Sequence, residues 1–402
     1  MRSSILPKWA SAFAAVSFLA SIFVVEASAD PIKTAFVIAM ENHNWIQPAS
    51  ETDVGQIYGS PYAPYINSLV TPGNVNAAQV SYASNYQNAG VGIHPSEPNY
   101  IWAEAGSNLG VTNDNDPFGP GGTNQTTTQS LSNFLQSTGH SWRSYQEDTD
   151  INLTNNQPLP KNQYTVPLSS QSGTFTSGTN QYNGSNQYNY AAKHNPQVFF
   201  STTNGGDNAT TSNPLAKNYA PLQQLATDLT NNTVAQYNWI TPDQYNDMHS
   251  TLRGGFTYHG QHLTGDAANI AQGDNFLSIV VPEIESSQAY KDDGAIIIWW
   301  DETEGADDAS HKLGEIVISP DARGNAYTNN TLYTHSSDLL TMEKIFGVGP
   351  CLRAACGAND LSDLFKPGSI PKTVVPEPAP IAMSALGIGL LVLWRRSYRR
   401  PA

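Results

Sequence analysis

The chain has 402 residues, of which 39% are hydrophobic and 13% are charged, and its formal net charge is −15. This length and hydrophobic content suit one large α/β domain with insertions. The negative charge argues against nucleic acid as a partner, because binding phosphates requires a basic surface, and against docking on anionic lipid surfaces.

The first 29 residues have the pattern of a secretory signal peptide. Arg2 and Lys8 precede an apolar run at residues 9–25, and residues 27–29 (Ala-Ser-Ala) are small, as cleavage sites require. We therefore expect an exported protein whose mature chain begins near Asp30. An uncleaved membrane anchor is the alternative, since the apolar run is close to the shortest that spans a bilayer.

The body of the chain, residues 30–369, alternates between short apolar runs and helical patterns. The runs expected to form buried strands are Thr34–Met40, 234–240, 295–300 and the less apolar 315–319. The helical patterns are 131–135 before Gly139, 222–229, and 337–346 before Gly347. This alternation predicts an α/β fold with a mostly parallel central sheet that is flanked by helices.

Residues 149–195 interrupt this alternation. They are rich in Asn, Gln, Ser, Thr, Tyr and Gly and show no clear period. We interpret them as a polar surface insertion, with local hairpins, rather than as a second core.

Two cysteines, Cys351 and Cys356, have four residues between them. A redox motif would have two intervening residues, and two lone cysteines are a poor metal site. In an exported chain the spacing predicts a disulfide that closes a small loop.

The last residues contain three elements in a fixed order. A linker at 370–375 leads to Pro376-Glu377-Pro378, then to an apolar stretch at 379–394, then to an arginine cluster at 395–400. Residues 376–402 thereby resemble the PEP-CTERM sorting signal. That resemblance implies an exosortase as partner, transient anchoring in the inner membrane, and a final place at the cell surface or in the extracellular matrix of a Gram-negative bacterium. An ordinary tail anchor is the alternative.

Acidic and amide side chains directly follow two of the predicted strands. Glu41-Asn42 follows the first strand, and Asp301-Glu302 follows the strand at 295–300. Functional groups gather beyond the carboxyl ends of parallel strands, so we expect both pairs to meet around one cation. Either pair alone would be weak support, because strands often end in polar residues.

A serine marks the start of a predicted helix that ends at Gly106. Ser96 is a good N-cap residue, and Pro98 is tolerated in a first turn. Most such serines only cap their helix. A hydroxyl at a helix N-terminus also lies where backbone amides favour a phosphate.

Five short motifs, in order along the body, resemble the phosphoesterase family, which contains acid phosphatases and phospholipases C within the alkaline phosphatase-like superfamily. The motifs are Glu41-Asn-His-Asn, Pro95-Ser-Glu-Pro-Asn-Tyr, Thr241-Pro-Asp-Gln-Tyr-Asn-Asp-Met-His, Trp300-Asp-Glu-Thr-Glu-Gly, and His335-Ser-Ser-Asp-Leu-Leu followed by Glu343-Lys-Ile-Phe-Gly. The resemblance implies an alkaline phosphatase-like fold.

The resemblance also implies roles for individual residues. Ser96 would be the nucleophile and a metal ligand, and Asn99 would contact a phosphoryl oxygen. The other expected metal ligands are Glu41, Asn42, Asp301 and Glu302. By the same resemblance, the residues that would bind a second metal or contact the phosphate are Asp247, His249 and His335.

Histidines are less clearly placed by the resemblance. His311 is a candidate for a histidine that relatives carry closer to the acidic pair, where this chain has Thr303, Glu304 and Asp307-Asp308 instead. We expect the remaining candidates to be surface or structural residues; they are His43, His94, His259 and His262.

The implied activity is metal-dependent hydrolysis of small phosphate esters through a phosphoserine. A phospholipase C acting on phospholipid head groups and a non-catalytic surface or matrix protein are the alternatives. The expected cofactor is a divalent metal ion: oxygen ligands suit Ca²⁺, Mg²⁺ or Mn²⁺, whereas adding His249 and His335 would suit zinc or iron.

Overall fold

The computed structural model describes residues 29–51, 55–88 and 93–372. The apolar run of the predicted signal peptide and the whole predicted sorting tail lie outside the described residues. Within the described part of the chain, no helix combines the length and the apolar character needed to cross a membrane.

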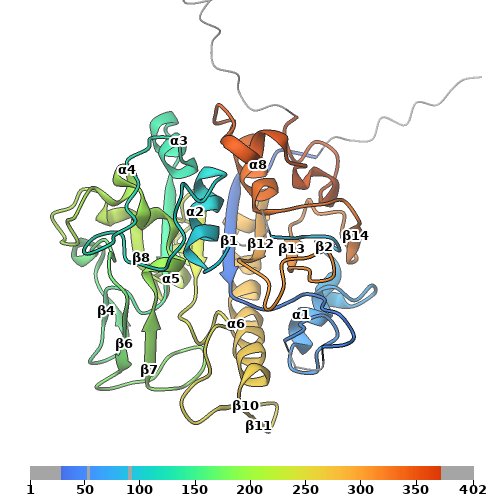
Figure 1. Ribbon diagram of the computed structural model, residues 1–402, viewed down its shortest axis with the longest axis horizontal. Helices are drawn as coiled ribbons and strands as arrows, with labels where there is room; N and C mark the ends of the chain where they lie inside the picture. Colours follow the sequence, from blue (N-terminus) through green and yellow to red (C-terminus); the bar gives the residue numbers. More distant parts are fainter. Residues whose placement is uncertain (1–28, 52–54, 89–92, 373–402) are drawn as a thin grey trace, which may run out of the picture.

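Eight strands form one sheet in the order β14-β2-β13-β12-β1-β9-β3-β8 (Figure 1). Their bounds are β1 Thr34–Met40, β2 Val80–Ala83, β3 Trp142–Gln146, β8 Tyr219–Pro221, β9 Tyr237–Thr241, β12 Gly294–Trp300, β13 Glu315–Ile318 and β14 Tyr327–Asn329. β13 runs antiparallel to both of its neighbours, and every other neighbouring pair is parallel. The predicted, mostly parallel sheet is thus confirmed, with the least apolar predicted strand as its antiparallel member.

Helices cover both faces of this sheet (Figure 1). α2 (Glu97–Ala105), α3 (Leu131–Thr138) and α8 (His335–Phe346) contact one another on one face. The long α6 (Asp266–Ser286) packs with α1 (Pro64–Leu69) and α7 (Gln288–Lys291) on the other. The shorter helices are α4 (Ser201–Asn204) and α5 (Gln224–Thr230). The 3-10 turns are Val75–Ala77, Lys161–Gln163, Ala192–His194, Pro196–Phe199, Ala216–Asn218, Arg353–Gly357 and Leu361–Leu364.

The hydrophobic core lies between these layers. The predicted ends of two helices are also confirmed. Every residue of β12 is buried, as expected for a strand covered on both faces. α3 and α8 end at Gly139 and Gly347, which both adopt the left-handed conformation that glycine tolerates best.

The polar insertion at 149–195 forms two antiparallel hairpins, as predicted. They pair β4 (Ile151–Asn152) with β5 (Gln157–Pro158) and β6 (Gln171–Thr174) with β7 (Gln187–Tyr190). A third hairpin, outside the insertion, pairs β10 (Phe256–Tyr258) with β11 (Gln261–Leu263). The insertion has no core of its own, because its buried Tyr164, Val166 and Tyr182 join the main hydrophobic core. Its last residues turn inward toward the carboxyl ends of the strands.

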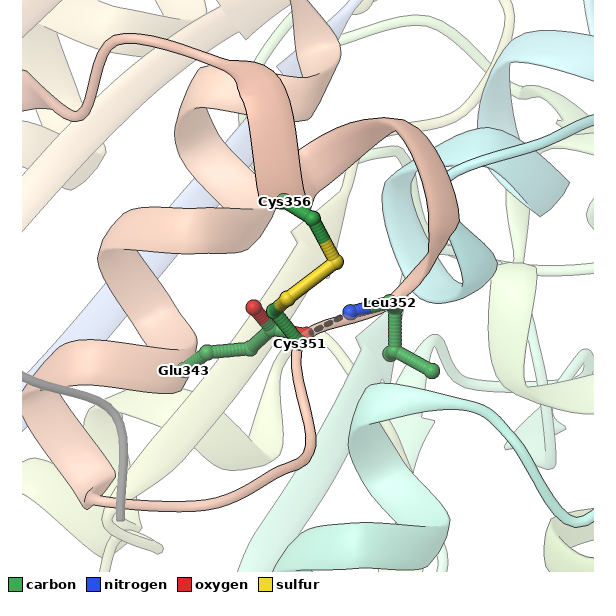
Figure 2. The surroundings of a disulfide bond; sticks show 4 residues. All are labelled: Glu343, Cys351, Leu352 and Cys356. Atoms are coloured by element: carbon green, nitrogen blue, oxygen red, sulfur yellow. Dashed lines mark hydrogen bonds between the residues drawn. A yellow bond between two sulfur atoms is a disulfide. The ribbon is translucent and has the colours of Figure 1, made fainter. Parts of the chain in front are cut away.

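The predicted disulfide is present (Figure 2). Cys351 and Cys356 are bonded, with their Cα atoms 5.3 Å apart, in the loop that follows α8. The backbone N of Leu352 in this loop donates to Oε1 of Glu343 at 2.7 Å, which ties the loop to the end of α8.

Candidate functional site

Two pairs of oxygen-bearing side chains meet where β1 and β12 end. The strands pair in parallel with Met40 opposite Trp300, so the residues that follow leave the sheet side by side. The backbone N of Asn42 donates to Oδ1 of Asp301 at 3.1 Å, and Nδ2 of Asn42 donates to Oε1 of Glu302 at 2.6 Å. The expected meeting of the two pairs therefore occurs.

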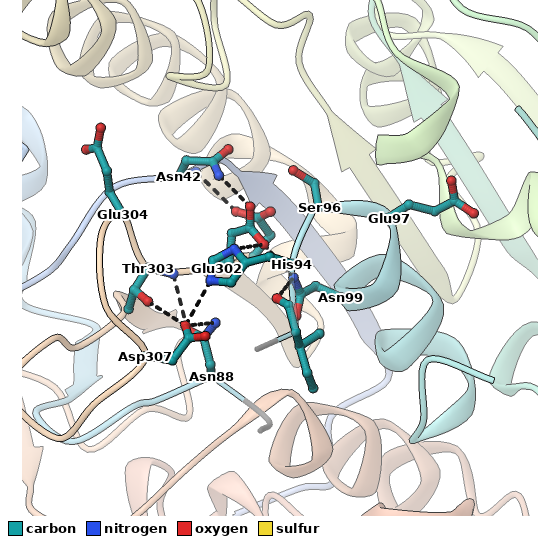
Figure 3. A network of polar contacts seen from close by, with 12 residues as sticks. Asn42, Asn88, His94, Ser96, Glu97, Asn99, Glu302, Thr303, Glu304 and Asp307 are labelled. Atoms are coloured by element: carbon teal, nitrogen blue, oxygen red, sulfur yellow. Dashed lines mark hydrogen bonds and ion pairs between the residues drawn. The ribbon is translucent and has the colours of Figure 1, made fainter. Parts of the chain in front are cut away.

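Ser96 and Asn99 reach this cluster from the start of α2 (Figure 3). The Ser96 hydroxyl donates to Oε2 of Glu41 at 3.1 Å. Ser96 occupies the N-cap position of α2, as predicted, but its hydroxyl makes no capping bond and serves the carboxylate instead. Nδ2 of Asn99 donates to Oε2 of Glu302 at 3.0 Å and to a backbone carbonyl at 3.2 Å. Asn99 therefore orients Glu302, and both of its amide hydrogens are already engaged.

The turn after β9 brings Asp247 and His249 to the same place. The backbone N of Glu41 donates to the carbonyl of Asp247 at 2.8 Å, and the backbone N of His249 donates to Oδ1 of Asp247 at 2.8 Å. Met248 between them has φ +85°, which is rare for a residue with a side chain. A Cβ on Gly273 of α6 would lie 2.4 Å from Cγ of Met248, so this glycine allows α6 to pack against the turn.

His194, which the sequence did not single out, lies between Glu41 and Asp247. Its Nε2 is 3.2 Å from Oε1 of Glu41, and its Nδ1 is 3.2 Å from Oδ2 of Asp247. Burial, followed by the positive charge of Lys193, holds the pKa of His194 well below its usual value, so the ring is neutral. A neutral imidazole has one N–H and can donate to only one of the two carboxylates. At the other contact, the lone pair of the unprotonated ring nitrogen faces a carboxylate oxygen. A bound cation would relieve this repulsion.

Lys193 places a positive charge beside this cluster. Its Nζ lies 3.0 Å from Oδ2 of Asp114 and 3.5 Å from Nε2 of His249. Its side chain is 15% exposed, and its charge lowers the pKa of Glu41 against the effect of burial. Lys193 and His194 close the polar insertion, and no motif of the sequence pointed to either; the one available signal was their position where the insertion returns to the sheet.

His335 is fully buried behind the cluster. Its Nε2 contacts the carbonyl oxygen of Asp301, which only accepts, so Nε2 carries the proton. Its Nδ1 accepts from Nε1 of Trp299 at 3.2 Å and lies 2.8 Å from the hydroxyl of Tyr86. Burial lowers the pKa of His335 to about 4. Both ring nitrogens are thus engaged, and the ring supports the backbone of Asp301 from behind.

His94, expected to be a surface or structural residue, lies at the site instead (Figure 3). Its Nδ1 is 2.7 Å from Oε2 of Glu302, and its Nε2 is 3.0 Å from Oδ1 of Asp307. The hydrogen bond to Glu302 is the main reason that the pKa of His94 rises to about 9, so the ring is positively charged at neutral pH.

The other four histidines of the sequence analysis are placed in three ways. His43 is buried and lines the cavity above the cluster. His311 contacts Glu51 at 2.9 Å and Asp308 at 3.0 Å, and it does not contact the strand-end acids. His259 and His262 are exposed on the β10–β11 hairpin, in agreement with the sequence analysis.

The cluster concentrates negative charge in a buried place. Burial raises the pKa of Glu41 to about 8 and, together with the neighbouring carboxylates, raises those of Asp301 and Asp247 well above their usual range. Oδ2 of Asp301 and Oδ1 of Asn42 are buried and have no hydrogen-bond donor. Orphaned carboxylate and amide oxygens at one point are what a hard divalent cation binds. The residues present therefore fit a divalent metal.

A polar cavity of about 430 Å³ opens beside the cluster. It is lined by Asn42, His43, His94, Met248, His249, Asp266, Asn269, Thr303, Glu304 and Gly305. Its polar walls suit a small, charged, water-soluble group.

The profile of the phosphoesterase family matches residues 33–349, a stretch that includes every residue of this cluster. The chain belongs to the phosphoesterase family. Among individual relatives, it is 26% identical to an acid phosphatase of Aspergillus fumigatus over 67% of this chain and 49% of that protein. It is 25% identical to a phosphatidylinositol-3-phosphatase of Mycobacterium tuberculosis over 91% of both chains. The chain spans about half the length of the fungal acid phosphatases it matches.

Solved structures that the chain matches include a protein of the alkaline phosphatase superfamily from Vibrio parahaemolyticus, with a TM-score of 0.42, 9% identity, and coverage of 84% of this chain and 72% of that one. The lipoteichoic acid synthase LtaP of Listeria monocytogenes has a TM-score of 0.47 and 9% identity, with coverage of 86% of this chain and 80% of that one.

The segment after the second acidic pair, where the sequence differs from what the resemblance led us to expect, contacts His94 (Figure 3). Oδ1 of Asp307 accepts from Nδ2 of Asn88 at 2.9 Å and from the hydroxyl of Thr303 at 3.0 Å. The same oxygen contacts His94. The segment therefore fixes His94 against Glu302 at the edge of the site.

Proposed function

We propose that the protein is a metal-dependent hydrolase of phosphate monoesters, with Ser96 as nucleophile and a phosphoserine as intermediate. The observation that carries the proposal is the hydrogen bond from the Ser96 hydroxyl to Glu41, within a buried cluster of oxygen ligands. A serine hydroxyl is a weak nucleophile unless a base or a cation favours its alkoxide. Glu41 is a base within reach of Ser96, and a cation held by the cluster would be the second kind of support.

The residues that would hold the metal are Glu41, Asn42, Ser96, Asp301 and Glu302. His194 and Asp247 contact the same cluster and extend the set, whereas His335 is already engaged behind it. A bound divalent ion would act as a Lewis acid toward a phosphoryl oxygen and favour the serine alkoxide. Oxygen ligands alone favour Ca²⁺, Mg²⁺ or Mn²⁺, and the inclusion of His194 favours zinc.

The protein's own residues account for the movement of protons and charge. The Ser96 oxygen bonds to phosphorus as the bond from phosphorus to the alcohol oxygen breaks, and the departing alkoxide takes a proton from water. A cation in the cluster would keep Glu41 ionised against the effect of its burial, so that its Oε2 can accept the serine proton. The positive charges of His94 and Lys193, which both lie beside the cluster, would offset part of the negative charge of the phosphate. Water, having lost a proton to the alkoxide, then bonds to phosphorus as the bond to the Ser96 oxygen breaks. Glu41 returns its proton to Ser96, and inorganic phosphate is released.

The relatives support a monoester as substrate. The fungal proteins are named as acid phosphatases, and the mycobacterial protein, which aligns over 91% of both chains, is named for a phosphoinositide monoester. The polar cavity has room for a small phosphate ester or for the head group of a phosphoinositide. Cleavage of a phospholipid by a phospholipase C would require the diester to be attacked instead.

We also propose, from the two ends of the sequence, that the protein is exported and held at the cell surface or in the matrix of a Gram-negative bacterium after processing by an exosortase. Mass spectrometry of the native protein should find residues 1–29 removed and the tail after Pro376 cleaved or embedded in membrane. Both ends intact in the cytoplasm would refute this.

The activity is tested with p-nitrophenyl phosphate, bis-p-nitrophenyl phosphate, phosphatidylinositol 3-phosphate and phosphatidylcholine, each with and without EDTA. We expect turnover of the monoesters, loss of activity with EDTA, and no turnover by Ser96→Ala. Ser130→Ala, a buried serine at the N-cap of α3, is the matched control and should keep activity. Release of head groups from phosphatidylcholine would favour a phospholipase C. Wild-type turnover by Ser96→Ala, insensitive to EDTA, would refute the mechanism, and no turnover of any substrate would favour a non-catalytic surface protein.

A further inference from the structure

A second buried acidic cluster lies at the ends of the two neighbouring strands, β3 and β9. Glu147 and Asp148 directly follow β3, and Asp243 follows β9, which runs parallel to β3 with Thr241 opposite Gln146. Ligand atoms of the three carboxylates lie within 4.8 Å of one another, and none of the three side chains is more than 1% exposed.

The negative charge of this cluster is not balanced by basic side chains. None of the three forms an ion pair with a Lys, Arg or His among the described residues. Glu147 is well supplied with donors: Asn180 Nδ2 at 2.6 Å, Asn246 Nδ2 at 3.0 Å and the backbone N of Asp243 at 2.8 Å. Both oxygens of Glu147 are therefore hydrogen-bonded, but these neutral donors do not compensate the charge of the cluster.

Each aspartate has one oxygen without a donor. Oδ2 of Asp148 accepts from the backbone N of Asn189 at 3.0 Å, and Oδ1 of Asp243 accepts from the backbone N of Asn246 at 2.8 Å. Oδ1 of Asp148 and Oδ2 of Asp243 are buried and have no hydrogen-bond donor, although the two side chains lie within hydrogen-bonding reach of each other. Two acceptors set against each other in the protein interior are unfavourable unless a proton or a cation lies between them.

The charge of Asp148 and Asp243 also requires compensation. Burial and the neighbouring Glu147 raise the pKa of both Asp148 and Asp243 well above the usual range, so full ionisation needs a compensating positive charge. Asp148 has φ +63°, in the left-handed region that aspartate and asparagine adopt more readily than other residues with a side chain.

We propose that Glu147, Asp148 and Asp243 form a second cation site, separate from the candidate active site, that binds a hard divalent ion such as Ca²⁺ or Mg²⁺. The ligands are all oxygens, which these ions prefer. No step of the proposed hydrolysis uses these residues, so the ion has a structural role.

The position of the site indicates what the ion stabilises. Asn180 and Asn183 of the polar insertion contact the cluster and Asn246, and Asn246 immediately precedes Asp247 of the candidate active site. An ion at this point would join the insertion, the end of β3 and the turn after β9. It would thereby fix the segment that carries Asp247 and His249.

The test counts bound Ca²⁺ and Mg²⁺ in the mature protein after EDTA treatment and reloading with each ion alone, and measures the increase in Tm on reloading. Four proteins are compared with wild type: Asp148→Asn, Asp301→Ala, the double variant, and Asp274→Asn, a buried carboxylate outside both clusters, as control. Asparagine keeps the size of the side chain and tolerates the left-handed backbone. Circular dichroism checks that each variant is folded.

We expect Asp148→Asn to bind one ion fewer per chain than wild type and the double variant to bind one fewer than Asp301→Ala. We also expect Asp301→Ala to keep a cation-dependent rise in Tm that the double variant lacks. If Asp301→Ala binds one ion fewer and Asp148→Asn does not, the second cation site is refuted and the active-site metal is supported. If Asp148→Asn binds one ion fewer and Asp301→Ala does not, the second cation site is supported and the active-site metal is refuted. If Asp148→Asn does not fold, Asp243→Asn replaces it. If Asp301→Ala shows neither a bound ion nor a change in Tm, the cluster shares a proton instead and the proposal is wrong.

Discussion

The hydroxyl of Ser96 donates to Oε2 of Glu41 at 3.1 Å, although 55 residues separate the two along the chain. The other carboxylate oxygen of Glu41 accepts from the hydroxyl of Tyr100, one turn further along α2. Both carboxylate oxygens of Glu41 are therefore held by α2, the helix whose N-cap is the proposed nucleophile. Because each oxygen has its own hydroxyl partner, the two hydrogen bonds can be removed one at a time.

This arrangement predicts that Glu41→Gln impairs catalysis far more than Tyr100→Phe. Removing a proton acceptor of a nucleophile typically costs about 10²- to 10⁴-fold in rate, and we expect a loss of kcat in that range for Glu41→Gln. Tyr100→Phe leaves the bond to Ser96 in place and should lose less than about 10-fold, as expected for one hydrogen bond worth about 1 kcal/mol. Steady-state kinetics with p-nitrophenyl phosphate checks both, and equal losses would contradict the assigned role of Glu41.

Much of the fold and the centre of the site could be predicted from the sequence, because they depend on local patterns. Continuous apolar runs identified β1 and β12, and parallel strands must bring the residues after them to one edge of the sheet. The meeting of Glu41 with Asp301 required no further information. Ser96 was found by its position at a helix start, even though its hydroxyl turned out not to cap that helix.

His194, Lys193 and His94 could not be found in the same way. The first two end a polar insertion without periodicity, and only the path of the chain in three dimensions returns them to Glu41 and His249. His94 was expected to be a surface or structural residue, and nothing in the sequence linked it to its partner Asp307, which lies in an irregular segment. Side chains placed by irregular loops leave no periodic signal in the sequence.

Replacing His194 should weaken metal binding without unfolding the protein. The ring contacts Glu41 and Asp247 inside the candidate metal cluster, so His194→Gln removes an imidazole nitrogen from the set while keeping a polar side chain. We expect a roughly 10- to 100-fold weaker metal affinity, the usual effect of losing a group that binds or orients a ligand. Metal titration of the EDTA-treated protein measures this, with the exposed His259→Gln as control. Unchanged affinity in His194→Gln would exclude the ring from the site.

The disulfide should contribute modest stability and no catalysis. Cys351 and Cys356 close a loop of only five residues' separation at the end of α8, and loop-closure entropy gives about 2 kcal/mol for so short a loop. Urea unfolding of Cys351→Ser/Cys356→Ser should show a loss of about that size, with kcat unchanged. Thiol titration of the unfolded, unreduced wild type should find no free cysteine, and two reactive thiols would contradict the bond.

The stability of the α1–α6 contact should depend on pH through Asp274. This carboxylate of α6 accepts from the backbone N of Ile66 at 2.7 Å and of Tyr65 at 3.0 Å, in the first turn of α1, and from the hydroxyl of Tyr258 at 2.8 Å. Burial raises the pKa of Asp274 from 3.8 to about 6. The folded protein then holds this proton more tightly than the unfolded chain, so the stabilising contribution is complete below about pH 4 and is lost as pH rises through 6.

Asp274→Asn removes this titration and keeps an acceptor oxygen. A difference of about two pKa units corresponds to roughly 3 kcal/mol, so the unfolding free energy of the variant relative to wild type should improve by up to that amount between pH 4 and pH 7. Urea unfolding at pH 4, 5, 6 and 7 measures the difference, with metal concentration held constant. The exposed Asp207→Asn is the control and should follow wild type at every pH. If the curves of Asp274→Asn and wild type stay parallel, the carboxylate has the same pKa in the folded and unfolded chains, and its burial under α1 imposes no pH dependence.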